Sequence, residues 1–138
     1  MHIFNSCSES SQYCVDTQTF GIAHLYNTEK TSDIHIHDCY EIYYSISGGR
    51  QFLINDCVYD FAPNDIFFIN NFETHHIQSL VDKEHERIVI HVHPKYLKEL
   101  STPQTNLEYC FSYREGGGSN KVSMTADEQK RFLYFINR

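Results

Sequence analysis

The sequence predicts a mostly β domain, built as a sandwich or barrel of short strands and followed by C-terminal helices. Short segments rich in β-branched and aromatic residues recur up to His93, and turn residues separate them. Beyond Pro94 the sequence becomes polar and then helical in pattern. Strands this short and this regularly spaced are typical of an antiparallel sandwich or barrel. The expected strands are 19–26, 34–37, 41–47, 51–54, 58–61, 66–69, 76–80 and 86–93.

Turn residues between these segments support the assignment. Asn55-Asp56 is typical of a tight hairpin turn. In Pro63-Asn64-Asp65, proline fixes one backbone dihedral and asparagine tolerates a positive φ. Gly48-Gly49 predicts a further turn before the next strand.

Helices are expected after the strands. Pro94 can open a short helix over 95–100. The sequence from Thr125 to Glu128 is a capping-box pattern, which predicts a helix with Phe132, Leu133 and Ile136 on one face. That face either packs back on the barrel or meets a second subunit.

Three regions are expected along the chain. Residues 1–18 are read as a loose polar arm, 19–100 as the barrel, and 101–138 as a linker and the start of a helical segment. The last helical pattern runs to Arg138 with no stop signal, so we expect the chain to be the front part of a longer protein.

Composition narrows the classes of function. The 138 residues carry a formal net charge of −7, which argues against binding a phosphate backbone through this segment. No stretch resembles a signal peptide or a membrane span, so a cytoplasmic protein without a membrane partner is expected. The five cysteines form no C-x-x-C motif, and we expect them to be reduced. Signatures of catalytic serine, catalytic cysteine and phosphate loops are also missing from the sequence.

The pattern His35-x-His37-x3-Glu41-x6-Gly48 is the main candidate site. Histidines one residue apart lie on the same face of a strand, because side chains alternate along it. Together with a histidine of the later His75-His76 pair, three imidazoles and a carboxylate could hold zinc, iron, nickel or manganese. They could equally bind a polar ligand, or form a hydrogen-bonded cluster without a metal.

Alternation also predicts which neighbouring side chains point inward. The strand from Glu41 would place Glu41, Tyr43, Ser45 and Ser47 on one face and apolar residues on the other, which suits a binding cavity packed against a further layer. Of the adjacent pair, His75 is the expected inward residue, because an apolar strand pattern resumes after His76. Pocket contact is less expected of His91 and His93, which end a strand, and His2, His24 and His85 are expected to be structural or solvent-facing.

These motifs, in this order, resemble a known family. HIHDCYEIYYSISGG resembles the first cupin motif, and its E-I-x-Y variant is similar to the sensor domain of AraC-type transcription regulators. FLINDCVYDFAPNDIFFINNFETHHI and IVIHVHPKYLKEL are similar to later segments of that family, and the similarity covers about residues 19–138. The resemblance implies a cupin-like barrel, a double-stranded β-helix or jelly roll, followed by C-terminal helices.

The resemblance also implies a function. The chain would be the ligand-sensing and dimerisation domain of a regulator, binding a small polar effector such as a sugar through His35, His37, Glu41, Tyr43 and His75. It would be a homodimer and not an enzyme, and DNA would be bound only by a C-terminal helix-turn-helix domain absent from this chain. The alternative is a stand-alone metal-dependent cupin enzyme, an isomerase or a dioxygenase.

Overall fold

A computed structural model describes residues 2–27, 38–48, 50–60, 62–70, 73, 75–79, 85–112 and 120–136. The expected strand 34–37, with His35 and His37, lies outside the described residues. In chain order the elements are β1 (Ile3–Phe4), α1 (Cys7–Thr17), β2 (Phe20–Asn27), β3 (Tyr40–Ser45), β4 (Arg50–Ile54), β5 (Cys57–Asp60), β6 (Asp65–Ile69), β7 (His75–Ser79), β8 (His85–Val92), α2 (Pro94–Leu100), α3 (Tyr109–Ser112), β9 (Lys121–Ser123) and α4 (Ala126–Ile136).

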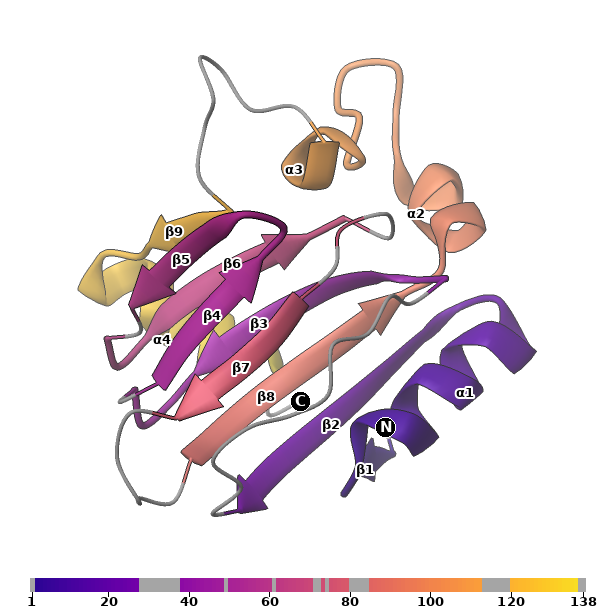
Figure 1. The fold of residues 1–138 in the computed structure, drawn as a ribbon. Helices are drawn as coiled ribbons and strands as arrows, with labels where there is room; N and C mark the ends of the chain where they lie inside the picture. The colour runs from indigo at the N-terminus through magenta and orange to yellow at the C-terminus, as the bar shows by residue number, and fades with distance from the viewer. Residues whose placement is uncertain are drawn as a thin grey trace.

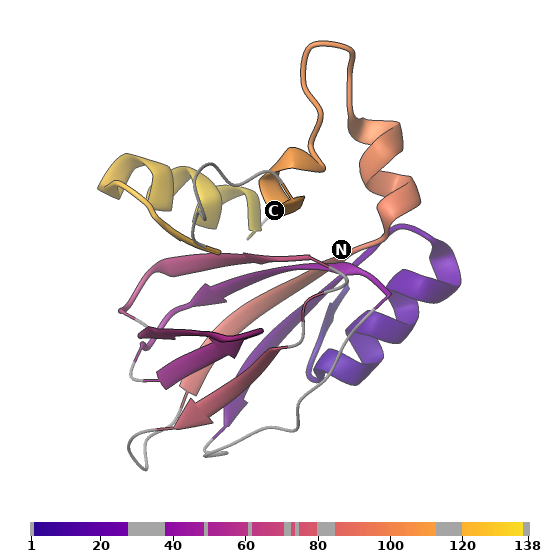
Figure 2. The same cartoon turned by 45° about the horizontal axis from the view of Figure 1, so that its top comes forward.

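Two sheets face each other (Figure 1). The larger sheet has the strand order β1-β2-β8-β3-β6-β9, and the smaller has the order β5-β4-β7. All neighbouring strands are antiparallel except β1 and β2. Helices α2, α3 and α4 lie on the outer side of the large sheet, opposite the small sheet (Figure 2).

The predicted fold class is confirmed, with two differences in detail. The domain is mostly β and is followed by C-terminal helices, as expected. Among the described strands, no pairing joins the two sheets, so they form a sandwich without full closure. The expected loose arm is wrong for residues 7–17, which form helix α1 with Ser6 as its N-cap: the Ser6 hydroxyl accepts a hydrogen bond from the Glu9 amide.

The predicted turns are present in the structure. Asn55 and Asn64 have positive φ angles of 51° and 72°, and Gly48 has a φ of 67°. Asparagine and glycine adopt this left-handed region at low cost, which explains their place between β4 and β5, before β6, and after β3.

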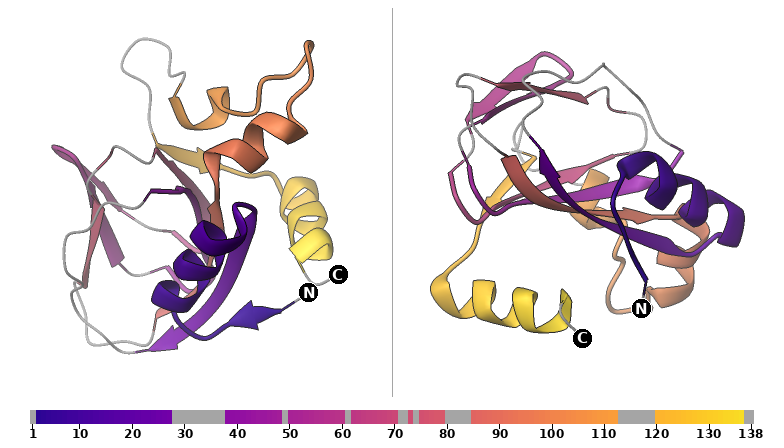
Figure 3. Two further views of the ribbon diagram at one scale, coloured as in Figure 1. Left: turned by 90° about the vertical axis from the view of Figure 1, so that its right-hand side faces the viewer. Right: turned by 90° about the horizontal axis from the view of Figure 1, so that it is seen from below.

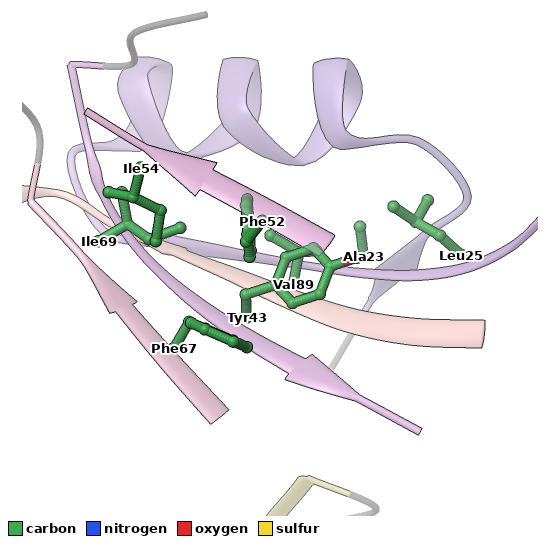
Figure 4. Close-up of a cluster of buried hydrophobic side chains, with 8 residues drawn as sticks. All are labelled: Ala23, Leu25, Tyr43, Phe52, Ile54, Phe67, Ile69 and Val89. Carbon is green, nitrogen blue, oxygen red and sulfur yellow. The ribbon is translucent and has the colours of Figure 1, made fainter. Parts of the chain in front are cut away.

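The space between the sheets is filled in its middle by apolar side chains from both (Figure 4). Phe52 of the small sheet lies over Tyr43 and Phe67 of the large one, with ring centroids 4.8 and 5.2 Å away. Tyr43 and its neighbours two residues away, Glu41 and Ser45, therefore share the inward face of β3. The cluster consists of Ala23, Leu25, Tyr43, Phe52, Ile54, Phe67, Ile69 and Val89.

The outward face of β3 carries Ile42 and Tyr44, and α4 covers it (Figure 3). The ring of Tyr44 lies 4.9 Å from that of Phe132, and Ile136 is buried in the same cluster. Of the two alternatives for the apolar face of α4, packing on the sheet is therefore the one observed.

Side-chain hydrogen bonds cap the N-termini of α4 and α2, and at α4 they form the predicted capping box. At α4 the Thr125 amide donates to the Glu128 carboxylate at 2.7 Å, and the Glu128 amide donates to the Thr125 hydroxyl at 3.3 Å. At α2, Nδ1 of His93 accepts from the Lys95 amide. His93 is thus a helix cap rather than a pocket residue.

None of the helices in the described part is long and apolar enough to cross a membrane.

Candidate functional site

The centre of the candidate site is a buried ion pair between the two sheets. Oε2 of Glu41 on β3 lies 2.9 Å from Nε2 of His75 at the start of β7, and both side chains are at most 4% exposed. Glu41 points inward because it shares the face of Tyr43, and His75 points inward as the sequence predicts. The pair is the point at which two sequence motifs far apart in the chain meet.

A backbone carbonyl holds the other side of the imidazole ring. The carbonyl of Glu73 accepts from Nδ1 of His75 at 3.2 Å, which leaves Nε2 directed at Glu41. Burial lowers the pKa of His75, but the negative charges of Glu41 and Glu73 and the hydrogen bonds to these residues outweigh burial, so the pKa is raised above its usual value.

Asn120, in the C-terminal part of the chain, holds the side chain of Glu73 through hydrogen bonds. Its side-chain amide donates to both carboxylate oxygens of Glu73, at 3.0 and 3.2 Å, and to the carbonyl of Phe68. Its side-chain oxygen accepts from the Tyr59 hydroxyl at 3.0 Å. Because Asn120 immediately precedes β9, this network connects the segment leading to α4 with the residue that orients His75.

Helix α1 lies at the same end of the sandwich. Glu41 is paired in register with His91 on β8, and His91 is buried with its Nδ1 2.9 Å from the Ser10 hydroxyl. The helix approaches β2 closely at Gly21, where an added Cβ would lie 2.3 Å from the Ser10 carbonyl oxygen. Glycine at this position therefore permits the contact that brings Ser10 to His91.

A different polar group lies further along the same inward face. The hydroxyl of Tyr43 is 3.2 Å from Nε2 of His85, and the Arg87 guanidinium donates to the His85 carbonyl. Both His85 and Arg87 are buried. The hydroxyl of Ser45 accepts from the Gly48 amide, so it stabilises the turn. The interior thus has polar groups on both sides of its apolar middle.

The predicted site residues are placed as follows. Glu41 and His75 are in contact, Tyr43 lies on the same face toward His85, and His35 and His37 lie outside the described residues. Carboxylate and imidazole are ligand types that a divalent metal accepts, so the observed pair suits two of the four predicted ligands. Among the residues that the structure describes, no group of three or more metal-ligating side chains comes together.

Several residues contribute more to the interior than their sequence pattern predicts. His91 was assigned a small role and His85 was grouped with residues outside the pocket, yet both are buried on the inward face of β8. His91 is two residues and His85 four residues from the buried Val89, so strand alternation puts all three on one face, opposite Ile88 and Ile90, which face the outer helices. Ser10 and Asn120 gave no local signal of their long-range partners.

Comparison with known proteins settles the family. A family model described as the AraC-like ligand binding domain matches residues 18–118. The chain belongs to this family. The resemblance inferred from its motifs is therefore confirmed, and the contact between Glu41 and His75 lies inside an AraC-like ligand binding domain. No curated protein matches the sequence.

Solved structures similar to this AraC-like domain share its fold. The plu4264 protein from Photorhabdus luminescens is 23% identical, with a TM-score of 0.51 over 56% of this chain and 66% of that one. A predicted oxalate decarboxylase from Thermotoga maritima is 19% identical, with a TM-score of 0.51 over 59% and 72% of the two chains. A cupin 2 conserved barrel domain protein from Salinispora arenicola is 15% identical, with a TM-score of 0.52 over 59% and 69%. At these identities the likeness concerns the cupin fold.

Proposed function

We propose that this domain senses a small polar effector, such as a sugar, which binds between the sheets beside Glu41 and His75. The single observation that carries the proposal is the buried contact between these two residues. The pair is a polar site within a largely apolar interior, and ligand sites use a few such groups to fix the orientation of a bound molecule. The family to which the chain belongs is one of ligand-binding domains.

The surroundings of the pair suit a sugar in particular. The carboxylate of Glu41 has two acceptor oxygens, of which Oε2 meets His75, and carboxylate oxygens accept hydrogen bonds from sugar hydroxyl groups. Phe52 lies next to the site, with its ring centroid 6.1 Å from that of His75, and offers an apolar surface to the carbon face of a sugar ring. Ligand sites commonly combine such an apolar wall with a few polar groups that fix orientation.

The rest of the proposal follows the family. The domain acts as a cytoplasmic sensor and not as an enzyme, it forms a homodimer, and DNA is bound by a helix-turn-helix domain outside this chain. His35, His37 and Tyr43 complete the ligand contacts, with the first two alternatively serving as metal ligands together with Glu41 and His75. Effector binding can alter DNA binding by the regulator only if it favours one arrangement of the sensor domain over another.

A thermal-shift screen with sugars, small organic acids and divalent ions tests the proposal. A ligand of the folded state at 100 times its Kd adds about 2.7 kcal/mol to the free energy of unfolding, which is readily visible as a higher melting temperature. We expect a sugar to stabilise the wild type and to lose this effect in Glu41→Gln and His75→Gln. The matched control is His24→Gln, because His24 forms an exposed ion pair with Glu86 on the protein surface.

Two results would contradict the proposal. One is stabilisation by a sugar that Glu41→Gln and His75→Gln leave unchanged, since the effector would then bind elsewhere. The other is catalytic turnover that depends on stoichiometric iron or manganese in the purified protein and is lost on His75→Gln, because an active metal with an open position is the enzyme alternative.

A further inference from the structure

Two cysteines from separate elements meet at the end of the sandwich where α1 lies. Sγ of Cys14, on α1, is 2.8 Å from Sγ of Cys39, which stands just before β3. Both thiols are buried, with exposures of 0% and 1%. This separation is well inside the ordinary contact distance of two sulfur atoms, and only a small movement separates it from the disulfide bond length of about 2.05 Å.

Contacts that do not involve the thiols hold α1 in this position. The Ser10 hydroxyl meets His91, and the Ser10 backbone closely approaches Gly21 on β2. Ser10 and Cys14 are four residues apart and therefore lie on the same face of α1. The packing of the helix thus presents Cys14 to Cys39, and the two thiols share a hydrogen bond.

We propose that Cys14 and Cys39 form a reversible disulfide that tethers helix α1 to the start of β3. The oxidant is a peroxide. One sulfur attacks an oxygen of the peroxide, the O–O bond breaks, and a sulfenic acid and one water are formed. The second sulfur then attacks the first, the S–O bond breaks, and the oxygen leaves as a second water that takes up the remaining thiol proton. Two thiols lose two electrons in total, and one hydrogen peroxide is reduced to two waters.

The tether acts on the end of the sandwich that holds Glu41. Cys39 is two residues before Glu41, and α1 supplies the Ser10 hydroxyl to His91, the register partner of Glu41. A bond between Cys14 and Cys39 fixes these parts against one another, and reduction by a dithiol releases them. This inference rests on the thiol geometry alone and is independent of the proposed effector.

Peptide mapping of the complete chain tests the assignment. Hydrogen peroxide is added to the reduced protein, remaining thiols are alkylated, and a protease that cleaves after glutamate is applied. Cuts after Glu9, Glu29 and Glu41 separate Cys7 from Cys14 and leave Cys39 in a peptide of its own. We expect peptide 10–29 linked to peptide 30–41, with the link lost after treatment with dithiothreitol.

A second measurement compares the thermal unfolding of oxidised and reduced protein. The bond restricts the unfolded chain, so oxidation raises the apparent melting temperature by several degrees in the wild type. Cys14→Ala and Cys39→Ala abolish this difference, whereas Cys57→Ala and Cys110→Ala, at exposed positions, leave it intact. Full alkylation of Cys14 and Cys39 after peroxide treatment, or linkage of either one to another cysteine, would overturn the proposal.

Discussion

Glu41 and His75 join the two sheets of this domain through a contact of 2.9 Å between a carboxylate oxygen and an imidazole nitrogen. Each residue lies on the inward face of its own strand, and neither is adjacent to the other in sequence or in a sheet. Because the backbone carbonyl of Glu73 engages Nδ1 of the same ring, the imidazole is oriented from both sides. The protonation state of His75 therefore reports on the whole site.

The substitution Glu41→Gln tests this electrostatic coupling. Burial lowers the pKa of His75, whereas Glu41 and Glu73 raise it. Glu41→Gln removes the Glu41 charge, so we expect the pKa of His75 to fall. The measurement is an NMR titration of the His75 ring protons in the wild type and in Glu41→Gln. The control variant is His24→Gln, which removes an exposed histidine paired with Glu86 and should leave the His75 titration unchanged. An unaltered His75 titration would show that Glu41 does not govern this ring.

The raised pKa of His75 also determines how the stability of the folded protein changes with pH. Because the pKa of His75 is raised in the folded protein, the folded state binds more protons than the unfolded state between the unfolded pKa, about 6.5, and the folded pKa. The stabilisation from His75 is thus fully present below about pH 6.5 and is lost as pH rises through the folded pKa. In urea titrations, the stability of the wild type relative to His75→Gln should accordingly decline across that window.

Asn120 is expected to matter more for stability than its position between a loop and a short strand suggests. Asn120→Ala removes the amide that donates to Glu73 and to the Phe68 carbonyl, leaving these partly buried acceptors without this donor. We expect a loss of roughly 1–3 kcal/mol in the free energy of unfolding, measured by urea denaturation.

The control for Asn120 is Gln51→Ala, which removes an amide hydrogen bond to Asp60 at the surface. This change should alter stability by no more than about 0.5 kcal/mol. Equal effects of the two substitutions would indicate that the Asn120 network adds nothing beyond an ordinary surface hydrogen bond.

Local patterns were sufficient to predict most strands and turns. The strands β3 and β6 combine apolar alternation with clear turn residues at their ends, and Asn64 marks the turn before β6 through its tolerance of positive φ. Helix α1 was missed because it faces the sheet with the small residues Ser10 and Cys14, so it shows no strong apolar stripe. Strand β9 was missed because a three-residue strand carries almost no pattern of its own.

The candidate site was predictable only where the alternation of side chains along a strand decides which of them point inward. Alternation placed Glu41 and His75 inward, and the same rule applied to β8 would have placed His85 and His91 there too. Ser10 and Asn120 could not be predicted, because their partners are His91 and Glu73, and only the tertiary fold brings these residues together. The meeting of Cys14 with Cys39 is of the same kind.

The two faces of α4 give a test of the proposed homodimer. Phe132 packs against Tyr44 on the sheet, whereas Tyr134 and Phe135 are 58% and 67% exposed and contact each other edge to face. Phe132→Ser should therefore lower the free energy of unfolding by roughly 1–3 kcal/mol through lost apolar burial. Phe135→Ser should change stability by less than about 0.5 kcal/mol.

Self-association should depend on Phe135 and not on Phe132, because the exposed pair Tyr134 and Phe135 is accessible to a second subunit. Sedimentation velocity over a range of concentrations is expected to show a dimer for the wild type, and a shift toward monomer for Phe135→Ser at unchanged stability. If Phe135→Ser sediments like the wild type, the dimer does not use this face of α4. If the wild type itself is a monomer at all concentrations, the domain does not dimerise through its own surface.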